Sequence, residues 1–218
     1  MPSAESRREA LKAVWQQAQT CAKCPQLAST RTKVVFGAGN ADAYLMFVGE
    51  APGANEDRLG LPFVGQAGKL LDTLLGEIGL SRPEVFICNT LKCRPPGNRD
   101  PLPGEIDACQ DYLFRQLELI RPKVVATLGN FATKLLSGRP DGITRVHGRE
   151  QHVVLGGNPV TLFPIFHPAA ALYTPRMLET LQQDFAKIPA LIGRELAPVA
   201  PVPVLAAVPT QPEQLGLF

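Results

Sequence analysis

The residues in this sequence best suited to holding a metal are four of its five cysteines. Cys21 and Cys24 form a Cys-x-x-Cys pair near the start, and Cys93 and Cys109 follow far along the chain. Four thiolates from two separate places can close the coordination shell of a structural zinc ion. An iron–sulfur cluster also takes four cysteines, and Cys93 and Cys109 are too far apart to form a second short knuckle. The spacing predicts a four-cysteine site and leaves the metal open.

The fifth cysteine, Cys88, lies inside an apolar run and is expected to be a small buried hydrophobic residue. The first residues are charged, unlike a secretory signal, and no apolar run approaches the length of a membrane span. We therefore expect a cytoplasmic protein, where clustered cysteines are more often metal ligands or catalytic residues than disulfides. The formal net charge of +2 is compatible with nucleic-acid binding and does not require it.

Three polar residues that could bind a ligand stand at the ends of separate apolar runs: Glu50, Asn89 and His167. The runs are rich in β-branched and aromatic residues, as is typical of strands buried on both faces of a parallel sheet. They cover residues 44–50, 84–90, 123–129 and 160–166. In such sheets ligands bind beyond the carboxyl ends of the strands, so we expect the three polar side chains to share one crevice.

Helical patterns fill the intervals between these runs. A capping box of Ser6 and Glu9 would open a first helix, and apolar stripes predict others. These later helices are expected over 67–80, 104–120, 130–136 and 175–188, with a hairpin or loop excursion at 143–158. Alternating strands and helices predict a parallel sheet covered on both faces, which is an α/β fold.

Each candidate binding residue also has an ordinary structural interpretation. Gly49 and Gly53 could serve a tight turn, and their spacing does not match a dinucleotide-binding or P-loop motif. Asn89 could cap a turn, His167 could be a satisfied core histidine, and Phe63 could be ordinary core. The functional interpretation rests on all of them falling on the same rim of one sheet.

Taken together, these motifs resemble those of the family 4 uracil-DNA glycosylases. The resemblance rests on separated stretches in matching order: GEAPGANEDRLGLPFVGQAGKLLD (49–72), NTLKCRPPGNRDPLPGEIDAC (89–109), LG (128–129) and FHPAA (166–170), with the four cysteines. It covers about residues 10–190. It implies a three-layer α/β/α sandwich with a central four-stranded parallel sheet. It also implies that Cys21, Cys24, Cys93 and Cys109 hold a 4Fe-4S cluster.

The resemblance implies roles for the residues on the rim. An enzyme that removes uracil must flip the nucleotide out of the stack, and Phe63 would be the platform for the flipped base. The Asn89 amide can donate to O4 and accept from N3–H, a pattern that cytosine reverses. His167 would donate a hydrogen bond to O2 of the departing uracil anion.

Further residues are expected to complete the site. Backbone groups of the turn formed by Glu50, Ala51 and Pro52 would bind uracil, and Glu56 would exclude the C5 methyl of thymine. Contacts with DNA phosphates are expected from three basic residues in the loop that follows the predicted strand 84–90: Lys92, Arg94 and Arg99. Ala51 stands where family 1 enzymes have a water-positioning aspartate. Glu50 is the nearest carboxylate, and we expect leaving-group stabilisation with an oxocarbenium-like sugar.

Two alternatives remain open from the sequence. One relative of the family forms a covalent adduct with uracil-DNA through a histidine in a basic loop, but the stretch CRPPGNRDP here has none. The other alternative is a non-catalytic, cluster-bearing DNA-binding module. We expect a monomer that acts at the nucleoid on single- and double-stranded DNA.

The segment 195–218 differs from the rest of the chain, since it is rich in Pro, Ala and Val and has no helical or strand period. We predict a folded domain over 1–194 and a disordered or polyproline-like tail. The final QLGLF resembles peptides that dock bacterial repair proteins on the sliding clamp. That resemblance implies binding through four side chains, with Gln214 at the edge of the groove and the apolar residues inside it: Gln214, Leu215, Leu217 and Phe218.

Overall fold

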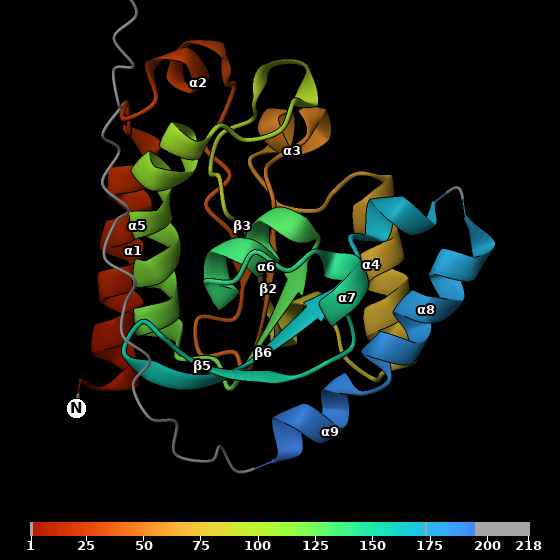
Figure 1. The fold of residues 1–218 in the computed structure, drawn as a ribbon. Coiled ribbons are helices and arrows are strands. Elements are labelled where there is room, and N and C mark those ends of the chain that lie inside the picture. Colours follow the sequence, from red (N-terminus) through yellow and green to blue (C-terminus); the bar gives the residue numbers. More distant parts are fainter. Residues whose placement is uncertain (1, 173, 195–218) are drawn as a thin grey trace, which may run out of the picture.

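The computed structural model describes residues 2–172 and 174–194 as one mixed sheet with helices on both faces (Figure 1). The sheet has six strands in the order β1-β3-β2-β4-β6-β5. None of the helices in the described part of the chain combines the length and the hydrophobicity that a membrane span requires. The C-terminal segment with its expected clamp-binding residues Gln214, Leu215, Leu217 and Phe218 lies outside the described residues.

The inner four strands of the sheet are parallel, as predicted. They are β3 (Phe86–Asn89), β2 (Leu45–Gly49), β4 (Val124–Leu128) and β6 (Asn158–Ile165). The expectation of a four-stranded sheet is wrong, because an antiparallel strand is added at each edge. These are β1 (Ala38–Gly39) and β5 (Gln151–Leu155).

The edge strands were difficult to predict for different reasons. β1 has only two residues, one of them a glycine, so no periodicity can form. β5 lies in the predicted hairpin region and pairs with β6 through a turn at Gly156 and Gly157, both at positive φ. Glycine tolerates that backbone region without a steric penalty, which is why it closes tight hairpins.

Helices cover the two faces of the sheet and enclose two hydrophobic cores. One face carries α1 (Ala4–Gln19), α5 (Pro103–Ile120) and α6 (Asn130–Ser137). The other carries α4 (Gln66–Glu77), α8 (Pro175–Phe185) and α9 (Ile188–Gly193). The remaining helical turns are short: α2 (Pro25–Thr30), α3 (Ala54–Leu59), α7 (Ile143–Val146), η1 (Arg82–Glu84), η2 (Pro96–Asn98) and η3 (Pro168–Ala171).

Strand β2 shows why the parallel strands read as continuous apolar runs. Met46 and Val48 belong to the core under α1 and α5, whereas Leu45 and Phe47 belong to the core under α4 and α8. Successive side chains point to opposite faces of a strand, and here both faces are buried. Because the inner strands run parallel, the carboxyl ends of β2, β3 and β6 lie at the same end of the sheet.

Two helix boundaries differ from the sequence prediction. The first helix begins at Ala4 and is capped by Ser3, whose Oγ accepts a hydrogen bond from the Ser6 backbone N–H at 3.2 Å. The predicted box of Ser6 and Glu9 is therefore one turn too late. The predicted helix 175–188 is divided into α8 and α9, with Pro189 in the first turn of α9, where a missing N–H costs nothing.

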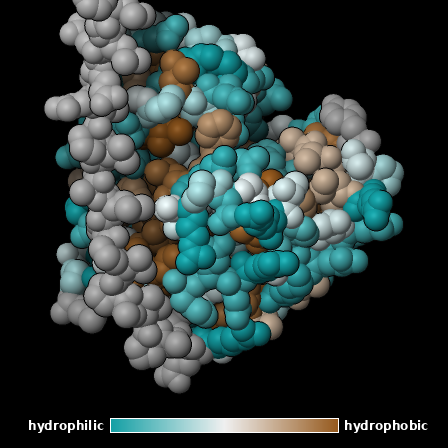
Figure 2. All heavy atoms as spheres, viewed as in Figure 1, coloured by the Kyte–Doolittle hydropathy of each residue, from teal (hydrophilic) through white to brown (hydrophobic). Residues whose placement is uncertain are grey.

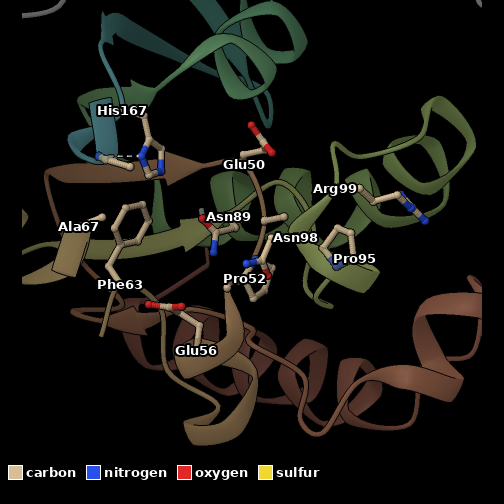
Figure 3. Close-up of a pocket in the computed structure, with 13 residues that line it drawn as sticks. Glu50, Pro52, Glu56, Phe63, Ala67, Asn89, Pro95, Asn98, Arg99 and His167 are labelled. Carbon is tan, nitrogen blue, oxygen red and sulfur yellow. Dashed lines mark hydrogen bonds between the residues drawn. The ribbon is translucent and has the colours of Figure 1, made fainter. Parts of the chain in front are cut away.

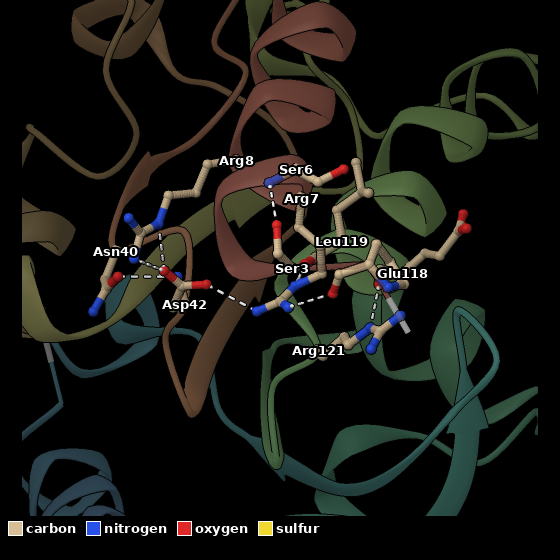
Figure 4. A network of polar contacts seen from close by, with 10 residues as sticks. Ser3, Ser6, Arg7, Arg8, Asn40, Asp42, Glu118, Leu119 and Arg121 are labelled. Atoms are coloured by element: carbon tan, nitrogen blue, oxygen red, sulfur yellow. Dashed lines mark hydrogen bonds and ion pairs between the residues drawn. The ribbon is translucent and has the colours of Figure 1, made fainter.

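The start of α1 is fastened to two neighbouring segments by a network of polar contacts (Figure 4). Arg7 donates to the Asp42 carboxylate at 3.0 Å and to the backbone carbonyl of Leu119, near the end of α5, at 3.0 Å. Arg8 donates to the same carboxylate at 2.6 Å. The network fixes the direction in which α1 runs toward the cysteine pair at its other end.

Candidate active site and cysteine cavity

A cavity of about 380 Å³ lies at the carboxyl ends of β2, β3 and β6 (Figure 3). Glu50, Asn89 and His167 all line it, which confirms that the three strand ends meet at one place. The other residues predicted to bind the base or to select it also line the cavity: Ala51, Pro52, Glu56 and Phe63.

Asn89 is the last residue of β3 and only 2% exposed. Its side-chain Oδ1 is buried and has no hydrogen-bond partner. A buried polar atom left unpaired costs about 1–3 kcal/mol, so such an atom in a cavity wall suggests a ligand that supplies the missing donor. Gly49 makes room for this amide, because a Cβ there would lie 2.4 Å from Oδ1.

Lys92 holds the end of β3 from behind the cavity. Its Nζ donates to the Asn89 backbone carbonyl and to Gln116 Oε1, both at 2.7 Å. Gln116 in turn donates to the Phe36 carbonyl at 2.9 Å. Lys92 is 1% exposed, so its predicted role as a phosphate contact is wrong. The sequence places Lys92 in a polar loop. It does not show that the side chain is buried by its hydrogen bond to the Gln116 amide on α5.

Phe63 forms an aromatic wall of the cavity from the loop between α3 and α4. Its ring lies against the His167 ring, with centroids 5.5 Å apart and planes inclined by 27°. Gly49 also permits this placement, because a Cβ there would lie 2.8 Å from the Phe63 ring. Phe63 has a φ of 53°, in the left-handed region that bulky residues rarely adopt.

His167 follows β6 and is fixed in one orientation. Its Nδ1 accepts the Ala169 backbone N–H at 3.1 Å, so a neutral ring carries its proton on Nε2. Burial lowers the pKa of His167 to about 4, against a minor opposing effect of the Glu56 charge. The imidazole is therefore neutral at physiological pH and offers Nε2–H as a donor.

The two carboxylates of the cavity differ in their surroundings, and Figure 3 shows them on opposite sides. Glu56 Oε1 accepts the backbone N–H groups of Val64 at 2.8 Å and Gly65 at 2.9 Å. Glu50 has no such donors, and its pKa is raised by burial and then by the charge of Asp100. Glu56 is thus an anchored carboxylate, whereas Glu50 is a half-buried one with elevated proton affinity.

Arg94 and Arg99 lie in the loop after β3, and both have partners within the chain. Arg99 lines the cavity and forms a two-pronged ion pair with Glu105, at 2.6 and 2.9 Å. Arg94 donates to Asn98 Oδ1 at 2.7 Å. Their contacts with phosphate remain a prediction.

The sequence did not identify several residues of the cavity wall: Ala67, Pro95, Asn98 and Ala169. For Asn98 a signal existed in the stretch PPGN, because Gly97 and Asn98 both adopt positive φ in a turn. Asn is one of the few residues other than glycine that tolerate this region. The two alanines carry no such signal, since small side chains merely allow the wall to approach.

The four predicted ligand cysteines line a second, smaller cavity, enclosed by the end of α1, the loop after β3, and α5. They are Cys21, Cys24, Cys93 and Cys109. Arg31 donates to Cys93 Sγ at 3.2 Å, and the Lys92 backbone N–H donates to Cys109 Sγ at 3.3 Å. Cys88 is fully buried in the core and does not line this cavity, as predicted.

The donor chemistry of this cavity fits the group that the family resemblance implies. Within residues 2–172 and 174–194, no three ligand-type side chains are spaced to hold a single metal ion. The four cysteine sulfurs that line this cavity are of the type and number that a four-cysteine site requires, and a cluster of several metal atoms spans more space than one ion. Burial raises the pKa of the Cys109 thiol to about 11, so metal binding must displace a proton.

Comparison with known proteins agrees with the geometry. Residues 36–189 match the family model of the uracil DNA glycosylase superfamily. The chain is 48% identical to a type-4 uracil-DNA glycosylase of Archaeoglobus fulgidus, over 86% of this chain and 96% of that protein. For the type-4 enzyme of Sulfurisphaera tokodaii the identity is 46%, over 87% and 86%. For that of Thermotoga maritima it is 42%, over 87% and 98%.

The family match extends over all six strands, including the three whose ends line the cavity, and over most of the covering helices. They include the residues at the ends of β2, β3 and β6 that line the cavity. The chain therefore belongs to the uracil-DNA glycosylase superfamily and, within it, to the type-4 uracil-DNA glycosylases.

Proposed function

We propose that this protein excises uracil from DNA by hydrolysing the N-glycosidic bond, which initiates base excision repair. It acts as a monomer in the cytoplasm, at the nucleoid. The observation that carries the proposal is the unpartnered Asn89 Oδ1, buried in a cavity that Phe63 and His167 also line. Family membership supplies the reaction class, and these residues supply the chemistry.

Asn89 selects uracil through paired hydrogen bonds. Its Oδ1 accepts from uracil N3–H, and its Nδ2 donates to O4. Cytosine presents an acceptor at N3 and a donor at C4, so both positions would be mismatched in a buried site. A site built to hydrogen-bond one pattern rejects the reversed pattern strongly, because its buried groups are left unpaired.

Phe63 and Glu56 act on the ring and its C5 edge. Phe63 provides the aromatic face on which the flipped base stacks, and Glu56 excludes the methyl group of thymine. The two backbone N–H groups bound by Glu56 Oε1 keep its side chain against the cavity wall. A fixed side chain rejects an extra methyl group more effectively than a mobile one.

His167 stabilises the leaving group. When the bond between N1 and C1′ breaks, its electron pair moves onto uracil, and negative charge develops on O2. The neutral imidazole donates Nε2–H to that oxygen, an interaction of about 3 kcal/mol by analogy with other oxyanion donors. Water then adds to C1′ of the oxocarbenium-like sugar, and its proton passes to solvent while the departing uracil anion takes up a proton. Glu50 is the nearest carboxylate that could orient this water.

The test is uracil release from short oligonucleotides, single-stranded and double-stranded. We expect release of uracil opposite guanine or adenine and no release of thymine opposite guanine. Glu56→Gly is the change expected to admit thymine. DNA binding without uracil release would instead favour the non-catalytic module, and a stable protein–DNA adduct would favour the covalent relative.

We also propose that Cys21, Cys24, Cys93 and Cys109 hold a 4Fe-4S cluster. Such a cluster would tie the α1–α2 turn to the loop after β3 and to α5, and it supplies no step of the hydrolysis. Protein purified without oxygen should contain about four iron and four sulfide per chain. One zinc per chain and no sulfide would overturn this assignment.

A further proposal concerns the C-terminal peptide QLGLF. Its resemblance to clamp-binding peptides supports docking on a bacterial sliding clamp, with Gln214 at the edge of the groove and Leu215, Leu217 and Phe218 in contact with it. A peptide of residues 209–218 should bind the clamp with micromolar affinity, and Leu217→Ala with Phe218→Ala should abolish binding. Deleting residues 209–218 should leave activity on short oligonucleotides unchanged. Absence of binding by the intact protein in calorimetry would end this proposal.

A further inference from the structure

Arg82, in η1 just before β3, reaches across to the loop that carries Phe63. Its Nη1 donates to the Pro62 carbonyl at 3.0 Å. Its Nη2 donates to the Phe63 carbonyl and, at 3.5 Å, to the Gly68 carbonyl. Its Nε pairs with the carboxylate of Asp72 on α4. One guanidinium thus contacts two backbone carbonyls of the turn at Phe63 and one in the first turn of α4.

That turn needs to be held. Phe63 is one of only three residues other than glycine with positive φ in the described part of the chain. A bulky residue in this region costs about 1–3 kcal/mol and persists only where its surroundings determine the conformation. The start of α4 also packs closely against the turn, because a Cβ on Gly68 would lie 1.8 Å from the Phe63 carbonyl oxygen.

The opposite side of the turn is held by Glu56. The carboxylate of Glu56 accepts hydrogen bonds from the backbone N–H groups of Val64 and Gly65. Arg82 donates hydrogen bonds to the carbonyls of the two preceding residues. The backbone around Phe63 is therefore fixed by a cation on its acceptors and an anion on its donors. The outcome is a ring packed against His167, with no side-chain polar group of its own to orient it.

We propose that Arg82 is a positioning residue for uracil excision: its guanidinium holds the left-handed turn at Phe63 and thereby the aromatic wall on which the flipped base stacks. This inference rests on the proposed function. Arg82 is not among the residues that line the cavity, so it acts through Phe63 and not on the base. A lysine would not replace it, because a single ammonium cannot match the planar fork that contacts several carbonyls.

The proposal predicts a particular kinetic signature. Stacking on Phe63 is present both in the bound state and in the transition state, so weakening it should raise KM and leave kcat nearly unchanged. We expect Arg82→Ala and Arg82→Lys to raise KM for a uracil-containing single strand by roughly tenfold, the scale of one lost base-stacking contact, with kcat within about twofold. Millimolar guanidinium ion should restore part of the loss in Arg82→Ala, and methylammonium should not.

Two matched variants separate positioning from general stability. Arg115→Ala removes an exposed arginine that pairs with Glu118 on α5, and it should leave both constants unchanged. Asp72→Asn removes the carboxylate partner while leaving the carbonyl contacts of Arg82, and it should raise KM by less than Arg82→Ala does. The melting temperature of each variant is measured alongside.

The kinetic results distinguish a failure of the positioning role of Arg82 from a failure of the proposed function. Unchanged KM in Arg82→Ala, or a fall in kcat and melting temperature without rescue by guanidinium, overturns the positioning role and leaves the proposed function intact. A parent protein that releases no uracil overturns the proposed function and this inference together. Raised KM, preserved kcat and selective rescue by guanidinium support both.

Discussion

The strand-end cavity and the cysteine cavity are both lined by residues of the loop after β3, but the polar atoms in their walls differ in hydrogen bonding. In the cysteine cavity, Cys93 and Cys109 each receive a hydrogen bond from a neighbouring nitrogen. In the strand-end cavity, Asn89 keeps a buried oxygen without a donor. Sulfur atoms that already accept hydrogen bonds suit a permanently bound group. An unpaired acceptor such as Asn89 Oδ1 suits a ligand that binds reversibly, because it remains available to distinguish a base that supplies a donor from one that does not.

Lys92 connects the two regions through different atoms. Its backbone N–H points to Cys109 Sγ, and its side-chain ammonium reaches the Asn89 carbonyl. The loop that would be anchored by the cysteine site therefore also holds Asn89, the residue proposed to bind the base. Figure 1 shows α1 and α5 side by side, with the loop from β3 leading into α5. We therefore expect changes at the cysteine cavity to affect mainly stability, and changes at the strand-end cavity to affect mainly uracil release.

The largest effect should come from the cysteine cavity. Cys109→Ser is expected to remove the cluster and with it several kcal/mol of folding free energy, because metal binding and folding are coupled in such sites. Visible absorbance, circular dichroism and soluble yield measure the loss. Cys88→Ser is the matched control and should keep the colour, since Cys88 does not line this cavity. A colourless Cys109→Ser protein with parental stability would show that this cavity is not architectural.

Asn89→Ala should separate activity from stability. We expect the single-turnover rate of uracil release to fall by roughly a hundredfold or more, as for loss of an essential transition-state contact. The free energy of unfolding should not fall, because the change removes an acceptor that is unpaired in the free protein.

Asn98→Ala is the control on the rim of the same cavity and should slow release much less, because Asn98 is exposed and bonded to Arg94. Equal rates for Asn89→Ala and the parent would contradict the base-reading role. A clear loss of stability in Asn89→Ala would contradict the view of a vacant acceptor.

Lys92→Met should affect both regions moderately. The change leaves the Asn89 carbonyl and Gln116 Oε1 without their donor, which costs about 1–3 kcal/mol of stability. We expect uracil release to slow by about tenfold, since the end of β3 loses its support. Thermal unfolding and single-turnover assays measure the two effects. Lys12→Met, at an exposed position on α1, is the control. If Lys92→Met and Lys12→Met have the same stability and the same rate of uracil release, Lys92 does not connect the two cavities.

The smallest effect concerns pH. The pKa of His167 is lowered to about 4 in the folded protein, below the ordinary value of 6.5. The unfolded state therefore binds its proton more readily, so the stabilisation is complete above pH 6.5 and is lost as pH falls toward 4. The loss should amount to roughly 2 kcal/mol after allowance for partial exposure.

Denaturation midpoints between pH 4 and pH 7 would show this dependence, and His167→Asn should flatten it. His152→Gln, at an exposed position on β5, should not. The rate of uracil release should stay level down to about pH 5, because the neutral imidazole persists there. A rate that falls by tenfold between pH 7 and pH 6 would contradict a His167 that is neutral in this range.

The sequence predicts the parallel strands and the meeting of three strand ends because these follow from periodicity and chain order. Runs that are apolar throughout indicate strands buried on both faces, and parallel strands place their carboxyl ends together. The two edge strands could not be predicted in the same way, since β1 is too short for any pattern. The side-chain direction of Lys92 depends on Gln116 and Asn89, which are brought together only by folding.

The same limit applies to Phe63 and Arg82. An aromatic residue in a glycine-rich loop suggests a stacking platform, and the cavity contains it. Neither the left-handed backbone at Phe63 nor the reach of Arg82 is visible in the sequence, because no local pattern joins residues on separate elements. Long-range polar contacts of this kind appear only when the three-dimensional arrangement is known.

The order of strands has a consequence for how the molecule behaves at high concentration. Both parallel edges of the inner sheet are covered, by β1 on one side and by β5 on the other. Exposed edges of sheets are templates on which other chains can add strands and aggregate, and short or polar edge strands discourage this. β1 offers only two residues, and exposed residues alternate with more buried ones along β5. At the β1 edge a second copy therefore finds only two residues of backbone to pair with, which disfavours edge-to-edge aggregation on that side of the sheet.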